Sequence, residues 1–333
     1  MRQSAWNKAS AILICCFFGC GSPDVSSDSG RLPSDEFLQV GDVRLHYIDW
    51  GGNGDLLLFV PGLSATARIY DGIAPAFTDE YRVVAMTRRG HGLSATPSTP
   101  EVTIDLLADE VAAVIAGLTD RPAVVVGHSF AGIEFPRLAA RHPDLVAAFV
   151  FLDAVYNWPL LLEPGPSLLG FESDSTFTSF TAAEDSYRAT FPELSSPVAL
   201  KHLRSKLRLR DDGLVVWRLP WSGPRITAFL NSYADWSGDE YQSITVPVLS
   251  IQADQEKIMI ANLRRRGFPP EIIDSTRAWN SRSSRAKAEG AALLRTAVPD
   301  AVFMMFDSTH HDIQVQRPVE VITAIEDFLR TVD

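Results

Sequence analysis

The sequence predicts an α/β fold built on a mostly parallel central sheet that is flanked by helices. Short apolar runs recur along the chain, and segments with helical spacing of apolar residues separate them. Strands that alternate with helices favour parallel pairing, because each helix returns the chain to the same end of the sheet. With 333 residues, 46% of them hydrophobic, the chain can bury a large core and also carry an insertion.

The first half of the predicted core begins with a hairpin that turns at Gly41-Asp42. The run 56–60 is wholly apolar, as expected of a strand that is covered on both faces. The predicted strands of this half are 37–40, 43–50, 56–60 and 82–86, and the predicted helices are 69–77 and 104–118.

The second half continues the alternation until residue 153 and resumes it at residue 246. Its predicted strands are 123–128, 145–152, 246–251 and 301–306, and its predicted helices are 133–141 and 319–329. Between these parts, helical patterns near 181–191 and 197–209 and many aromatic residues predict a helical lid, inserted after the sixth strand. We therefore expect a core of 36–153 and 246–333 with a lid of 154–245.

The N-terminus has the order of a secretory signal: charged Arg2 and Lys8, an apolar run over 9–18, and small residues around Cys20. It resembles a bacterial lipoprotein signal, which implies cleavage after residue 19 and a lipidated Cys20 on a cell-envelope protein. Phe17 departs from the usual leucine, and ordinary cleavage or an uncleaved anchor are the alternatives. Residues 20–35 are then a flexible tether. Because the signal also contains the other two cysteines, no internal disulfide is expected in the mature chain.

The charge balance excludes one class of partner. The formal net charge is −11, and removal of Arg2 and Lys8 with the signal makes it more negative. An acidic protein repels the phosphates of nucleic acids and gains little from anionic lipids. We expect no nucleic-acid partner and a membrane contact only through a lipid on Cys20, while the oligomeric state stays open.

A serine stands at the corner between an apolar strand and a helical run, in Gly127-His128-Ser129-Phe130-Ala131. A serine at such a sharp turn requires small residues two positions before and after it, which Gly127 and Ala131 provide. The next backbone amide, that of Phe130, opens the helix and can donate to an oxyanion. Ser129 is therefore a candidate nucleophile, although a helix-capping serine in a turn would give the same short pattern.

Several further segments resemble the α/β-hydrolase superfamily. They are 51–54 (GGNG), 60–63 (VPGL), 87–94 (TRRGHGLS), 127–134 (GHSFAGIE) and 151–156 (FLDAVY). Within the superfamily, the last three are similar to a bacterial subgroup of hydrolases. The resemblance covers roughly residues 37–333 and implies the fold rather than a substrate.

The resemblance implies the remaining members of a catalytic site. It gives Leu63 as the second oxyanion donor, beside Phe130. It places the catalytic histidine near His310 and His311, and Pro318, seven residues after His311, favours His311. The acid follows either the sixth or the seventh strand in relatives, so Asp153 is favoured, with Glu256 second and Asp254 third. His91 and His128 are common in relatives and are expected to hold loops by hydrogen bonds.

These roles predict a serine hydrolase that cleaves a small or medium ester through an acyl-enzyme on Ser129. The alternatives are a lyase or a cofactor-independent oxygenase on the same fold, and a homologue that binds a ligand without turnover. No cofactor and no metal site are expected. Residues 257–297, which include three consecutive arginines, could form a second lid element, a partner surface or a solvated helix, the last being the default.

Overall fold

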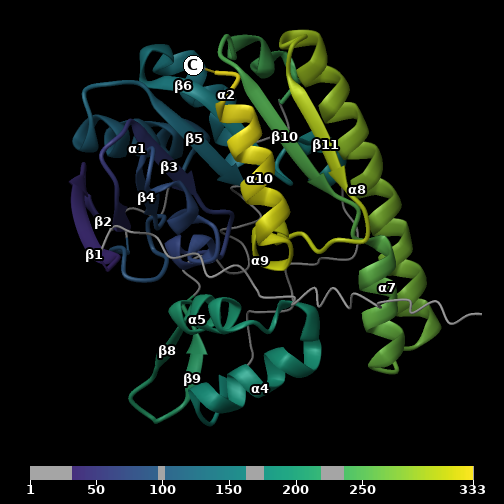
Figure 1. The fold of residues 1–333 in the computed structure, drawn as a ribbon. Coiled ribbons are helices and arrows are strands. Elements are labelled where there is room, and N and C mark those ends of the chain that lie inside the picture. The colour runs from purple at the N-terminus through teal and green to yellow at the C-terminus, as the bar shows by residue number, and fades with distance from the viewer. Residues whose placement is uncertain (1–31, 97–101, 163–175, 219–235, 333) are drawn as a thin grey trace, which may run out of the picture.

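The computed structural model describes residues 32–96, 102–162, 176–218 and 236–332, and its centre is an eight-stranded sheet (Figure 1). The strand order is β1-β2-β4-β3-β5-β6-β10-β11. The predicted signal, Cys20 and most of the tether lie outside the described residues. The strands are β1 (Ser34–Val40), β2 (Val43–Gly51), β3 (Leu56–Val60), β4 (Arg82–Met86), β5 (Ala123–His128), β6 (Val146–Leu152), β10 (Val248–Ala253) and β11 (Val302–Phe306).

The pairing of these strands confirms the mostly parallel sheet. Strand β2 pairs antiparallel with β1 and with β4, and every other neighbouring pair is parallel. The chain leaves β3 toward β4 and later returns to β5 on the other side of β3. The loops that follow β3 and β5 therefore diverge at the carboxyl ends of adjacent strands, which is where open α/β sheets bind ligands.

Helices cover both faces of the sheet. One hydrophobic cluster joins Leu56 and Leu58 of β3 to helices α1 (Ile104–Leu118), α2 (Ala131–Arg141) and α8 (Pro270–Ala297). The other joins Leu57 and Phe59 to the 3-10 helices η1 (Ala67–Tyr70) and η2 (Ala74–Phe77) and to α10 (Pro318–Leu329). Because successive side chains of a strand point to opposite faces, the wholly apolar β3 is buried on both.

The predicted helix over 69–77 is wrong, because η1 and η2 stand in its place. Their backbone hydrogen bonds run from residue i to i−3, for example from Ile69 N to Thr66 O and from Ile73 N to Tyr70 O. Pro75 has no N–H for an α-helical bond, and Gly72 lowers helix propensity just before it. The apolar spacing was correct, but these two residues divide the segment.

The segment between β6 and β10 contains a small sheet that the helical lid prediction missed. Strands β7 (Thr176–Phe177), β9 (Val215–Trp217) and β8 (Leu207–Leu209) pair antiparallel in that order. Strands of two or three residues are too short to show alternation in a sequence. The described helices of this segment are α3 (Trp158–Leu162), α4 (Phe180–Thr190), α5 (Pro197–Ser205), and the 3-10 helices η5 (Pro192–Leu194) and η6 (Asp239–Ser243).

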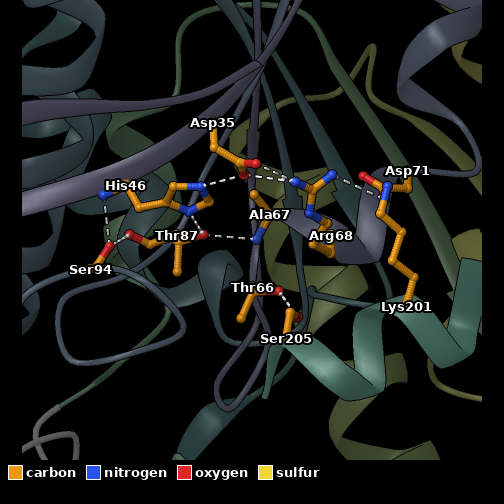
Figure 2. A network of polar contacts seen from close by, with 10 residues as sticks. All are labelled: Asp35, His46, Thr66, Ala67, Arg68, Asp71, Thr87, Ser94, Lys201 and Ser205. Carbon is orange, nitrogen blue, oxygen red and sulfur yellow. Dashed lines mark hydrogen bonds and ion pairs between the residues drawn. The ribbon is translucent and has the colours of Figure 1, made fainter. Parts of the chain in front are cut away.

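Helix α5 is tied to the core by polar contacts, as Figure 2 shows. Lys201 Nζ lies 2.8 Å from Asp71 Oδ2, and Ser205 Oγ lies 2.6 Å from Thr66 Oγ1. Arg68, on η1, joins Asp71 to Asp35 on the first strand. Since Thr66 and Asp71 follow β3, helix α5 lies over the carboxyl end of that strand.

The C-terminal helices complete the fold. Helix α7 (Glu256–Arg265) is followed by the 28-residue α8, and α9 (Ile313–Gln316) precedes α10. The default expectation of a solvated helix is wrong for the second half of α8, where every third or fourth residue is buried. The buried residues of α8 are Asn280, Ser283, Ala286, Lys287, Gly290, Ala291 and Leu294. Of the helices in the described ranges, none is sufficiently long and apolar to cross a bilayer.

Candidate active site

Ser129 lies at the junction of β5 and α2 with a strained backbone. Its φ is +53°, in the left-handed region that residues with a side chain avoid. Ser129 N donates to Leu152 O at the end of β6 (3.0 Å), and Ser129 O accepts from Gly132 N (3.0 Å). The surrounding structure therefore fixes this conformation, which is a feature of residues held for function.

Small residues allow the chain to crowd around Ser129. A Cβ at Gly127 would lie 2.2 Å from the Phe135 ring and 2.7 Å from Ala131 Cβ. The tightest approach is at Gly132, where a Cβ would lie 1.8 Å from Ala154 O. Sequence reasoning assigned the small downstream position to Ala131 and gave no role to Gly132. Because Gly132 contacts the loop after β6, position 132 tolerates a larger side chain less well than position 131.

His311 and Asp153 meet at the carboxyl ends of β11 and β6. Asp153 Oδ2 lies 2.6 Å from His311 Nδ1; the carboxylate is fully buried, whereas the imidazole is 30% exposed. This hydrogen bond leaves His311 Nε2 as the ring atom that can accept a proton. The ring also lies against that of His128, the residue before Ser129, with 4.6 Å between their centroids.

The other candidates for the acid and the base have different surroundings. Glu256 is the exposed first residue of α7. Asp254 follows β10, where its Oδ1 accepts from Glu256 N (3.3 Å). His310 Nδ1 accepts from Asp312 N (3.3 Å), so this ring braces the turn before α9. Asp153 is the carboxylate that the structure brings to His311.

The carboxylate of Asp153 has further partners, among them the Tyr156 hydroxyl. Its Oδ1 accepts from Ala253 N (3.0 Å) and from Lys287 Nζ (2.7 Å). Burial alone would raise the pKa of Asp153, but the charge of Lys287 and the hydrogen bond to His311 hold it well below its usual range. Lys287 was missed at the sequence level because it stands in a charged, helical stretch. The small residues Ala286 and Gly290 beside it were the available signal that this face is buried.

The loop after β3 lies against the serine corner. A Cβ at Gly62 would lie 2.9 Å from Ser129 Cβ, so the loop approaches Ser129 closely at Gly62. Leu63, whose N–H is the candidate oxyanion donor, is the next residue in the chain. Arg88 fixes this loop, because its Nε donates to Pro61 O (2.7 Å) while its Nη1 pairs with Glu134 of α2. Burial raises the pKa of Glu134 to about 7 even though Arg88 opposes the shift.

Neither Arg88 nor Glu134 was given a role from the sequence. Both side chains are buried, and together they join the loop after β3 to the helix that begins at the serine. A glutamate within the buried first turn of a helix was the signal, because a buried carboxylate requires a partner.

Two histidines hold loops by hydrogen bonds, as expected. His91 Nε2 accepts from Ser64 N (3.2 Å), and its Nδ1 lies 2.9 Å from Arg89 O, which fixes the neutral tautomer. His128 Nε2 lies 3.0 Å from the backbone oxygen of His311. Burial lowers the pKa of His91 and of His128 to about 4. Both rings are therefore neutral near neutral pH.

A metal would need several ligands in one place. No group of three or more His, Cys, Asp or Glu side chains suited to hold an ion occurs in the described ranges. The histidines of this region instead contact backbone atoms and carboxylates.

Comparison with known proteins gives a consistent result. A model of the alpha/beta hydrolase family matches residues 57–324. The chain is 26% identical to 2-(acetamidomethylene)succinate hydrolase of Mesorhizobium japonicum over 72% of its own length and 84% of the relative's. It is 25% identical to an esterase of Mycobacterium tuberculosis over 67% of this chain and 74% of that one. A bifunctional esterase/perhydrolase of Acinetobacter calcoaceticus is 30% identical over 65% and 80%, respectively.

Solved structures give the same fold. The crystal structure of E-2-(acetamidomethylene)succinate hydrolase superposes with a TM-score of 0.69 at 21% identity. The match covers 90% of this chain and 100% of that one.

Proposed function

Since the chain belongs to the alpha/beta hydrolase family, we propose that it is a serine hydrolase that cleaves a small or medium ester through an acyl-enzyme on Ser129. Its relatives named above are hydrolases, so hydrolytic activity is supported at this coarser level. The observation that carries the finer proposal is the 2.6 Å contact of His311 with Asp153. The His311 ring also packs on that of His128, the residue before the strained Ser129.

In the first half of the reaction, His311 Nε2 removes the proton of Ser129, and the serine oxygen attacks the ester carbonyl. Asp153 holds Nδ1–H and stabilises the imidazolium that forms. The N–H groups of Leu63 and Phe130 donate to the oxyanion of the tetrahedral intermediate. The intermediate collapses as His311 gives its proton to the departing alcohol, which leaves an acyl group on Ser129.

In the second half, His311 removes a proton from water, and the resulting hydroxide attacks the acyl carbonyl. The same two amides hold the second oxyanion, and Ser129 recovers its proton when the acid departs. No step requires a cofactor. The substrate is a small molecule, in line with the succinate derivative in the name of one relative.

Activity-based labelling with a fluorophosphonate tests the proposal. The wild type is expected to label at Ser129 and to hydrolyse nitrophenyl esters, whereas Ser129→Ala and His311→Ala lose both activities. His310→Gln is the matched control for the histidine and is expected to label. Ester hydrolysis that survives in Ser129→Ala would overturn the proposal.

The alternative functions predict different results in labelling, ester hydrolysis or thermal unfolding. A lyase or a cofactor-independent oxygenase would show neither an ester burst nor an acyl-enzyme. A ligand-binding homologue would gain thermal stability from a compound that it does not cleave. Either result in a folded wild type would replace the hydrolase proposal.

We propose further that the protein is exported and anchored to the bacterial cell envelope by a lipid on Cys20. The order of charged, apolar and small residues before Cys20 supports this. In a bacterial host, the wild type is expected in the membrane fraction and Cys20→Ala outside it. Equal partition of the two proteins would contradict a lipid anchor on Cys20: both in the membrane would favour an uncleaved signal, and both outside it would favour ordinary cleavage.

A further inference from the structure

Lys287 is a buried lysine whose ammonium group is directed at the carboxylate of Asp153. Its Nζ lies 2.7 Å from Asp153 Oδ1 and donates to Ala253 O (2.5 Å). The side chain is 6% exposed and also lies over the Tyr156 ring, 5.6 Å from its centroid. Burying an ammonium group is unfavourable unless it is paired with an opposite charge. A lysine that only made the surface soluble would not be buried, so the burial of Lys287 points to a role at Asp153.

The backbone of α8 is fixed at this point, so the position of Lys287 is built into the fold. Ala286 O accepts from Asn157 N (2.7 Å), in the loop that follows β6. A Cβ at Gly290 would lie 2.4 Å from the carbonyl carbon of Tyr156. These contacts, one residue before and three residues after Lys287, press the helix against the loop that carries Asp153.

We propose that Lys287 is a positioning residue, and that it holds Asp153 with Oδ2 toward His311 in the catalytic site. The positive charge of Lys287 also opposes protonation of His311, so His311 acts as a base at lower pH. The inference rests on the proposed function only in taking His311 as the base. Oδ1 is occupied by Lys287 and by Ala253 N, so the carboxylate cannot rotate away from His311.

The sign of the charge effect follows from the groups around the pair. Asp153 faces Lys287 from α8, His311 and His310 from the turn after β11, Tyr156 from its own loop and His128 from β5. His311 also faces the carboxylate of Asp312, which is unchanged in the Lys287 variants. Of these, Lys287 is the one that is cationic when the imidazoles are neutral. Its removal makes protonation of the Asp153–His311 pair easier, so the base is lost at a higher pH.

The test is the rate of fluorophosphonate labelling, measured between about pH 5 and pH 9. In Lys287→Met, we expect the rate at its plateau to fall by on the order of 10- to 100-fold, because the carboxylate is no longer held. We expect the acid limb to move up by about one pH unit, because a charge in contact is lost. Lys287→Gln, which keeps a donor but no charge, is expected to recover part of the plateau rate and none of the pH shift.

Arg285→Met is the matched control, since it removes one cation from the exposed face of the same helix. In an Asp153→Asn background, Lys287→Met is expected to lose most of its effect, because the lysine acts through that carboxylate. An unchanged pH profile in both Lys287 variants would overturn the proposal, as would an equal effect with and without Asp153.

If the proposed function is wrong, the wild type itself does not react with the fluorophosphonate, which distinguishes that failure from a failure of the Lys287 proposal. The imidazole NMR signal of His311 is then the readout, identified by its absence in His311→Gln. Its titration midpoint is expected to rise in Lys287→Met, and an unchanged midpoint would overturn the role of Lys287 regardless of the reaction.

Discussion

At the scale of single residues, buried charges determine what the site can do. Asp153, Lys287, Arg88 and Glu134 are all at least nine-tenths buried, and each charge has a partner of opposite sign. Such pairs add little net stability, but loss of one member leaves the other unpaired. They fix the geometry of the loops that carry the candidate oxyanion donors and the acid.

Variants of Asp153 and Glu256 distinguish the two candidates for the catalytic acid. Asp153→Asn is expected to lower the labelling rate by on the order of 10³- to 10⁴-fold, because the amide no longer stabilises the imidazolium. Glu256→Gln is expected to label at the wild-type rate, because Glu256 is exposed on α7. The reverse order of these two rates would assign the acid to Glu256.

The sequence was sufficient for residues whose neighbours are local and insufficient for those with distant partners. Ser129 could be selected because Gly127, Phe130 and Ala131 surround it in the chain. Lys287 could not, because 134 positions separate it from Asp153 and its charge looks like that of a solvated helix. Asp153 was selected over Glu256 by resemblance rather than by any spacing rule.

At the scale of elements, close backbone approaches hold the site together. Helix α2 contacts the loop after β6 at Gly132, and α8 contacts the same loop at Gly290. Continuous apolar runs made the strands predictable, since both faces of the sheet are covered. The 3-10 helices and the sheet of β7, β8 and β9 were not predictable, because short elements carry too few residues to show a period.

Gly132→Ala tests the approach of α2 to the loop after β6. The added methyl group would meet Ala154 O at 1.8 Å, so we expect a loss of about 1–3 kcal/mol in the free energy of unfolding, measured in urea, and slower labelling. Gly72→Ala is the control, because its Cβ would make an ordinary 3.5 Å contact with Val198. Equal stability of the two variants would refute this account of the corner.

The contact between α5 and the core predicts a local change in dynamics. Asp71→Asn removes the charge that pairs with Arg68 and Lys201, so amide exchange in α5 is expected to accelerate while that in α10 does not. Asp327→Asn, in an exposed pair with Arg330, is the control for losing a surface carboxylate. Unaltered exchange in α5 would show that the contacts of Asp71 in Figure 2 do not hold this helix.

At the scale of the whole molecule, buried neutral histidines link stability to pH. Burial lowers the pKa of His91 and His128 to about 4 and that of His202 to about 3, from 6.5. The unfolded chain therefore binds more protons than the folded one as the pH falls below 6.5, and stability decreases. Glu134, with its pKa raised to about 7, acts in the opposite direction over the same range.

Burial also lowers the pKa of His46 and of His310, and it raises that of Glu110. Because five histidines oppose two carboxyl groups, the free energy of unfolding is expected to fall by about 4 kcal/mol between about pH 6.5 and pH 4.5. Asp153 stays charged throughout this range, because its pKa is held low. Urea titrations at several pH values measure the slope. A stability that is constant or increases on acidification would contradict the neutral, buried state of these rings.

The covalent intermediate is the central claim, and its direct detection is the decisive measurement. The protein is mixed with nitrophenyl acetate, quenched in acid within the first turnover, digested and analysed by mass spectrometry. We predict one acetyl group on the peptide that contains Ser129, absent from Ser129→Ala. Rapid hydrolysis of the ester with no acyl group on that peptide would contradict the account.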